Sequence, residues 1–102
     1  IYEYNPIPGQ PLIRGPYFKE WLEWRARNIQ SWLNEASDAV QRRRPGVNLA
    51  VYVGSWYQDY YGVGVNWGAP DYAPGYDWMS ASYPFTGYAP RLNWITTGCY
   101  YT

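Results

Sequence analysis

The sequence has no histidine and a single cysteine in 102 residues. Without histidine, the usual zinc sites and the histidine-based catalytic triads cannot be built within one chain. One cysteine also excludes a framework of intramolecular disulfides. We therefore expect no metal site and no bound cofactor, and any catalysis would have to depend on other side chains.

Charged residues are scarce as well. They make up 16% of the chain, and eight basic residues balance eight acidic ones to give a net charge of zero. Nucleic acids and anionic membranes bind basic surfaces, so this balance argues against both as partners.

The chain also lacks a run of about 18 apolar residues, the length that a membrane-spanning helix requires. Because it begins at Ile1 and not at methionine, we interpret it as processed or excised.

Aromatic residues, in contrast, are abundant. They account for 22% of the chain, and residues 46–102 hold four of the 7 Trp and ten of the 13 Tyr. A chain this aromatic can bury surface, which argues against disorder, and its length suits one domain over 1–102. Residues 46–102 carry only four charged residues, so their surface suits a ligand that is polar but neutral.

The spacing of apolar residues predicts a long helix over 17–43. Gly15 can serve as its N-cap and Pro16 as its first helical residue, and Pro45-Gly46 would end it. Apolar side chains recur every three or four residues and form one stripe that must be covered. The members of this stripe are Phe18, Leu22, Ile29, Leu33, Ala36 and Val40.

Two strands are predicted after the helix. Residues 47–53 alternate valine and leucine with other side chains, and because both faces are largely apolar we expect a buried parallel strand. Residues 92–101 predict a second strand, in which Trp94, Ile95 and Cys99 are the residues expected to be buried.

A long loop and a short helix are expected between these strands. The Gly-, Pro- and Tyr-rich segment 54–76 follows the C-terminal end of a strand, where α/β folds place their sites, and long loops of this kind are usually functional. Residues 80–92 predict the short helix. Two parallel strands bury little by themselves, and the helix stripe needs a wider sheet. We therefore infer a piece of a larger α/β fold, or a chain that is completed by another chain.

Four segments resemble a group of bacterial glycoside hydrolases of the alpha-amylase or glycosyl-hydrolase-like type. They are FKEWLEWRA at 18–26, YVGSWY at 52–57, YYGVGVNWGA at 60–69 and TGCYY at 97–101. The resemblance implies a (β/α)8 barrel, a glycoside or polysaccharide substrate, and an extracytoplasmic setting, periplasmic or secreted. A complete barrel needs about 250 residues, so this chain would supply about two βα units and would associate with the rest of the barrel.

Glycoside hydrolysis usually needs two carboxyl groups, about 5–9.5 Å apart, on either side of the scissile bond. After the first predicted strand the available acids are Asp59, Asp71 and Asp77. Asp59 lies six residues past Val53 and is the candidate catalytic residue, because it could reach the mouth of a barrel. The alternative interpretation is an aspartate that caps a turn in the loop.

Aromatic side chains of the loop form the candidate substrate-binding set. Flat rings match the apolar faces of sugars, and polar groups at the rim can read sugar hydroxyls. The candidates are Trp56, Tyr57, Tyr60, Tyr61, Asn66 and Trp67, together with Tyr100 and Tyr101 at the end of the second strand. The alternative is that the rings pack the loop onto the fold as part of its core.

Three functional hypotheses follow. The leading one is a fragment of a glycoside hydrolase that acts on or binds an oligo- or polysaccharide. The second is a non-catalytic glycan-binding module, which would bind sugar without turnover. The third is a structural piece that self-associates through its helix stripe and sheet edge.

Overall fold

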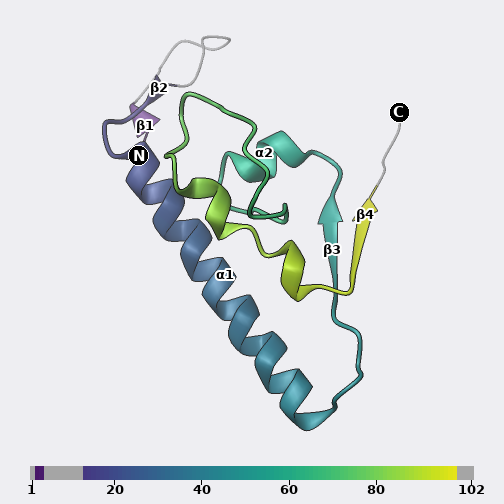
Figure 1. Cartoon of the computed structure of the whole chain (residues 1–102). Coiled ribbons are helices and arrows are strands. Elements are labelled where there is room, and N and C mark those ends of the chain that lie inside the picture. The colour runs from purple at the N-terminus through teal and green to yellow at the C-terminus, as the bar shows by residue number, and fades with distance from the viewer. Residues whose placement is uncertain (1, 4–12, 99–102) are drawn as a thin grey trace.

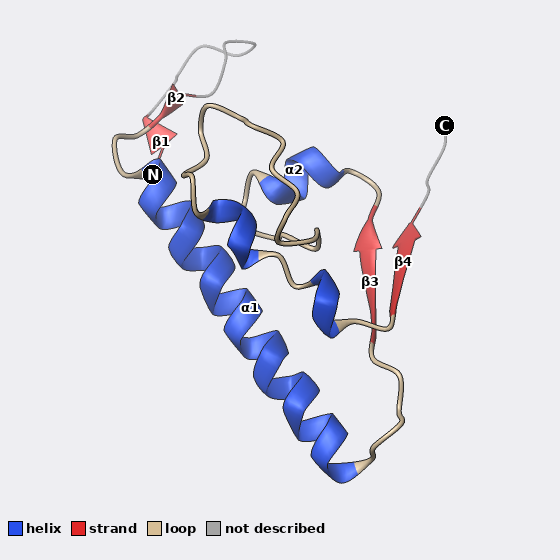
Figure 2. Cartoon of the chain, viewed as in Figure 1, coloured by secondary structure: helices blue, strands red, loops and turns tan. Residues whose placement is uncertain are grey.

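The computed structural model describes residues 2–3 and 13–98 (Figure 1). Two short antiparallel strands, β1 (Tyr2–Glu3) and β2 (Ile13–Arg14), precede the long helix α1 (Phe18–Arg43). The chain continues through β3 (Ala50–Gly54), α2 (Tyr57–Tyr61), the two 3-10 helices η1 (Tyr83–Thr86) and η2 (Ala89–Arg91), and β4 (Trp94–Gly98). In Figure 2, α1 lies along one side of the view and the strands β3 and β4 along the other.

The predicted long helix is confirmed as α1, with a different start. Tyr17 is its N-cap and the helix begins at Phe18. Pro16 lies in the preceding turn, which is closed by a hydrogen bond from the Phe18 N–H to the Gly15 carbonyl oxygen (3.2 Å). Pro45 and Gly46 follow the helix, and Gly46 has a φ of +92°, a conformation that glycine adopts without strain.

The apolar stripe of α1 is covered chiefly by the aromatic segment that follows β3. In the N-terminal half, Phe18, Leu22 and Ala26 pack with Tyr61 and Tyr83. Further along, the buried side chains of Leu33, Val53, Trp67 and Tyr88 form a second cluster. Aromatic side chains thus cover Phe18, Leu22 and Leu33 without a wider sheet, while Ile29, Ala36 and Val40 are only half-buried.

The strands β3 and β4 form a two-stranded parallel sheet in which Ala50 lies opposite Trp94 and Gly54 opposite Gly98. The first strand is shorter than the predicted 47–53, because residues 47–49 are irregular. The expected burial of the second strand is wrong. Trp94 and Ile95 are 60% and 40% exposed, and in the described part of the chain no strand other than β3 pairs with β4. Cys99 lies outside the described residues.

The segment before β4 is built from two 3-10 helices instead of one short α-helix. Pro84 and Pro90 lie in the first turns of η1 and η2, where the missing proline N–H is tolerated. Gly87 adopts an extended conformation between them. The helix–strand order matches the α/β expectation, while membership of a (β/α)8 barrel stays a prediction.

Packing of α1 against the aromatic segment can be tested with a matched pair of variants. Leu22 is completely buried, whereas Trp24, two residues away on the same helix, is 64% exposed. We expect Leu22→Ala to lower the free energy of unfolding by about 2–5 kcal/mol and Trp24→Ala by less than about 1 kcal/mol. Urea unfolding followed by circular dichroism measures both values. A larger loss for Trp24→Ala would contradict this arrangement.

Candidate functional site

Two of the aromatic residues predicted to bind sugar belong to the core. Tyr61 is completely buried, and its ring stacks on Tyr57 (centroids 5.2 Å apart) and meets Tyr83 edge-on (4.6 Å). Trp67 is only 9% exposed and packs edge-on against Tyr57. Burial raises the pKa of the Tyr57 hydroxyl to about 12, and neighbouring tyrosines add to this rise. These rings serve the fold, as the alternative interpretation of the loop expected.

Asn66 is also an internal residue and does not lie at a rim. Its side chain is 1% exposed, and its amide nitrogen donates a hydrogen bond to Thr86 Oγ1 (3.2 Å). Its amide oxygen accepts hydrogen bonds from the Gly68 N–H (3.0 Å) and from the Tyr57 hydroxyl (3.4 Å). Asn66 therefore ties the loop after α2 to η1.

Three of the predicted rings, Trp56, Tyr60 and the largely buried Trp67, line a hollow of about 330 Å³ at the C-terminal end of β3. Tyr52 and Tyr88, which the sequence did not single out, also line it, and none of its lining residues is charged. Gly54 is needed there, because a Cβ atom at this position would lie 2.6 Å from the Tyr60 ring. The hollow can accept a neutral group with an apolar face.

The acidic residues of the loop do not converge on this hollow. Asp59 is exposed in the first turn of α2, a position in which a carboxylate stabilises a helix terminus, and it does not line the hollow. Asp71 and Asp77 are exposed as well. Within residues 2–3 and 13–98, no group of three His, Cys, Asp or Glu side chains could hold a metal ion. Tyr100 and Tyr101, also predicted at the site, lie outside the described residues.

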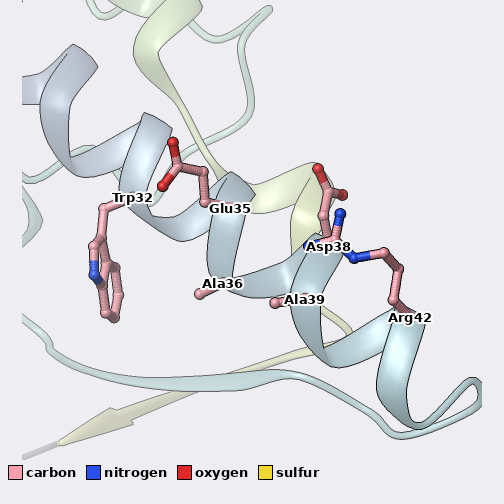
Figure 3. A pocket seen from close by; sticks show the side chains of 6 residues that line it. All are labelled: Trp32, Glu35, Ala36, Asp38, Ala39 and Arg42. Atoms are coloured by element: carbon pink, nitrogen blue, oxygen red, sulfur yellow. The ribbon is translucent and has the colours of Figure 1, made fainter.

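A second hollow, of about 450 Å³, lies on the C-terminal half of α1. Figure 3 shows its lining side chains, which all come from that one helix. They are Trp32, Glu35, Ala36, Asp38, Ala39 and Arg42. Asp38 is occupied by an ion pair with Arg91 of η2, with 2.6 Å between its Oδ1 and the arginine Nη1. The hollow is a depression on a helix surface and holds no arrangement for acid–base chemistry.

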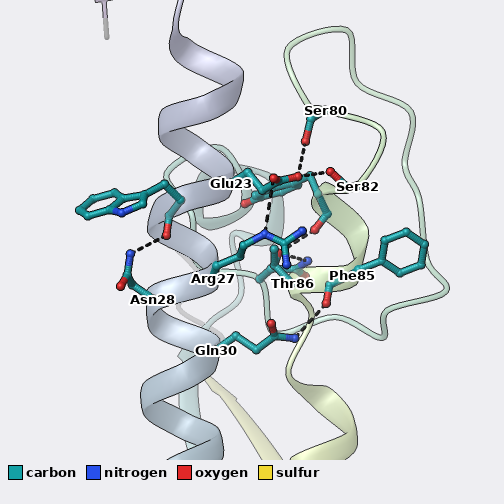
Figure 4. Close-up of polar contacts among 11 residues, drawn as sticks. Glu23, Arg27, Asn28, Gln30, Ser80, Ser82, Phe85 and Thr86 are labelled. Atoms are coloured by element: carbon teal, nitrogen blue, oxygen red, sulfur yellow. Dashed lines mark hydrogen bonds and ion pairs between the residues drawn. The ribbon is translucent and has the colours of Figure 1, made fainter.

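The main electrostatic feature is a cluster around Glu23 that the sequence did not predict. Figure 4 shows the Glu23 carboxylate of α1 accepting hydrogen bonds from the hydroxyls of Ser80 and Ser82 and pairing with Arg27 (3.4 Å to its Nε). The Ser82 hydrogen bond is the largest influence, and together with Ser80 and Arg27 it holds the pKa of Glu23 below its ordinary value, against the opposing effect of partial burial. The cluster fastens the loop before η1 to the helix.

Comparison with known proteins finds a similarity to a surface-layer-related protein. Over 106 aligned residues the chain is 30% identical to an S-layer-related protein of Niallia circulans. The alignment covers 86% of this chain but spans only 6% of the length of that relative. No protein-family model matches the chain, and no solved structure matches it.

The resemblance to glycoside hydrolases is overturned by these comparisons. No family and no structure of that class matches, and the relative that was found carries a different description. The motifs that suggested the resemblance consist largely of aromatic and glycine residues, several of which pack the core of this chain. In addition, none of the helices in the described ranges combines the length and the apolar character needed to cross a membrane.

Because Trp67 is buried and Trp56 is half exposed, removing their rings should lower the free energy of unfolding by different amounts. We expect Trp67→Ala to lower the free energy of unfolding by about 3–5 kcal/mol, the range for a buried aromatic ring. Trp56 is 48% exposed, so Trp56→Ala should cost less than half as much. Thermal and urea unfolding of the two variants would measure this difference, and equal costs would contradict it.

The Glu23 cluster predicts a pH dependence. The pKa of Glu23 is lower in the folded chain than in the unfolded chain. The stabilisation that Glu23 contributes is therefore complete above its unfolded-state pKa and is lost as the pH falls through its folded-state pKa. We expect Glu23→Gln to be less stable than the wild type by about 1 kcal/mol at pH 7, with the difference shrinking below about pH 4. Urea unfolding between pH 3 and pH 7 measures it. A difference that does not vary with pH would contradict the role of the charge.

Proposed function

We propose that this chain is a structural module of a larger cell-surface protein and that it works by associating with other protein chains. The similarity to an S-layer-related protein supports a structural role at a cell surface. That relative is far longer than the aligned region, which supports the view that a chain of this kind forms one module of a larger protein.

The observation that carries the proposal is the exposed sheet. Tyr52 on β3 and Trp94 on β4 are 61% and 60% exposed. They lie on the same face, because the register places Trp94 opposite Ala50, two residues before Tyr52, and side chains two residues apart share a face. Parallel sheets are normally covered on both faces, and two strands alone are marginal. An exposed apolar face of this kind is typical of an interaction surface.

The alternative to a second copy of this chain is that strands from the rest of a longer polypeptide complete the two-stranded sheet. A fragment of an α/β barrel, as expected from the sequence, would have its sheet completed in this way. The isolated chain would then remain monomeric, because the missing strands would come from residues that it does not contain. This alternative and self-association therefore predict different particle masses for the isolated chain.

A second candidate function is binding of a neutral glycan at the hollow formed by Trp56, Tyr60, Tyr52 and Tyr88. The aromatic and uncharged lining favours it, because sugars present apolar faces and hydroxyl groups. If glycan binding is the function, Trp56→Ala should weaken binding of an oligosaccharide by about 1–3 kcal/mol, by analogy with other stacking on aromatic rings. Calorimetric titration with cell-wall oligosaccharides tests this candidate, and unchanged affinity would contradict it.

The assembly proposal predicts the particle mass in solution. Gel filtration with light scattering should give a mass larger than the 11.9 kDa of one chain, increasing with protein concentration. High salt should not dissociate the particles, because apolar burial is not screened by ions. A monomer at every soluble concentration would contradict self-association.

A further inference from the structure

We infer that β4 pairs antiparallel with β4 of a second copy of this chain, around a two-fold axis at Ile95. The inference rests on the proposed function and names both the surface and the partner. Its product is a four-stranded sheet with the strand order β3–β4–β4–β3, in which β4 is no longer an edge.

The backbone of β4 presents Ile95 to this edge. The Trp94 N–H donates a hydrogen bond to the Leu49 carbonyl oxygen (3.3 Å), so the polar backbone groups of Trp94 face β3. In a strand paired in parallel, successive residues direct these groups to opposite sides. The N–H and C=O of Ile95 therefore point away from β3, into the edge that a further strand would occupy.

The side chains of β4 lack the usual protection of an edge strand. Natural edges are commonly guarded by lysine, by proline or by other charges, which discourage pairing with another chain. The sequence of β4, WITTG, contains none of these, and the first four of its five residues are exposed. It also combines β-branched and aromatic residues, the composition that favours pairing between strands.

Charge favours a second copy as the occupant. The described charged residue nearest to β4 in sequence is Arg91, and its guanidinium is already paired with Asp38. Two copies of β4 can therefore approach without placing like charges opposite each other, which would oppose pairing. The zero net charge of the chain removes the long-range repulsion between copies as well.

The register follows from the side chains. With the axis at Ile95, the two Ile95 residues exchange both backbone hydrogen bonds, and their apolar side chains meet. Trp94 then lies opposite Thr96 of the second copy in a pair without mutual hydrogen bonds, where side chains approach most closely. Aromatic and β-branched side chains form favourable pairs across strands. Moving the axis to Thr96 would place Trp94 opposite Gly98, which offers no side chain.

The test is a charge swap at the proposed axis. Ile95→Lys and Ile95→Glu each place two like charges opposite one another, and each should raise the dissociation constant of the dimer by about tenfold or more. An equimolar mixture of the two variants should restore the dimer. Sedimentation velocity of the wild type, each variant and the mixture measures the outcome, and circular dichroism verifies that the variants fold.

Tyr52→Lys is the matched control. It introduces the same charge at an exposed position of the same sheet, but on β3 and away from the proposed axis, so it should leave most of the dimer intact. A dimer that persists in both Ile95 variants, or a mixture that remains monomeric, would overturn pairing through β4 while leaving association of the chain in place. A monomeric wild type would overturn the proposed self-association as well.

If the charged variants fail to fold, disulfide cross-linking tests the same pairing of β4. In a Cys99→Ser background, Ile95→Cys should form a cross-linked dimer on mild oxidation, because Cα atoms of a hydrogen-bonded antiparallel pair lie about 5.5 Å apart. Tyr52→Cys should not, because its counterpart would be three strand spacings away, about 14 Å. Equal cross-linking at both positions, or none at Ile95→Cys, would overturn the proposed register.

Discussion

Tyrosine rings packed against the first half of α1 hold the rest of the described chain in place. Tyr61 and Tyr83 meet edge-on and lie against Leu22, and all three side chains are completely buried. The Tyr83 hydroxyl also donates a hydrogen bond to the Tyr61 carbonyl oxygen, so one ring supplies both apolar surface and a polar contact. This core fixes α2 and η1 on the helix, and the Glu23 cluster fastens the loop before η1 to it.

A consequence of this arrangement is that the sheet contributes little to the core. Val53 of β3 is buried in the second cluster, but β4 lies at the edge of the sheet formed by the described residues, and most of its own residues are exposed. The aromatic segment occupies the helix surface that a wider sheet would otherwise cover. The chain therefore folds around its helix and leaves apolar side chains exposed on β3 and β4, among them Tyr52 and Trp94.

The periodicity of the sequence predicted where the helix and strands lie better than it predicted which of their residues are buried. The stripe from Phe18 to Val40 predicted α1 closely, because its spacing is a local property of the helix. The same apolar criterion failed for Trp94 and Ile95, since being apolar does not specify which partner covers a residue. It also failed to separate the loop rings, because Tyr61 and Trp56 differ in burial only through long-range contacts with α1 and η1.

The Glu23 cluster could not be predicted from the sequence, because it too depends on contacts between distant segments. Its serines lie more than fifty residues from Glu23 in sequence, and no local pattern links them. The predicted binding site was less accurate than the predicted fold, because the match of aromatic rings and polar rim groups to a sugar included residues such as Asn66 that the fold uses internally.

In the proposed assembly, the aromatic core is complete within one chain, whereas the β4 edge is completed by a second copy. Amide hydrogen exchange measured at several protein concentrations tests it most directly. We predict that the Leu22 amide is protected at every concentration and that protection of the Ile95 amide rises as the concentration rises. Exchange at Ile95 that does not depend on concentration would contradict completion of the β4 edge by a second copy.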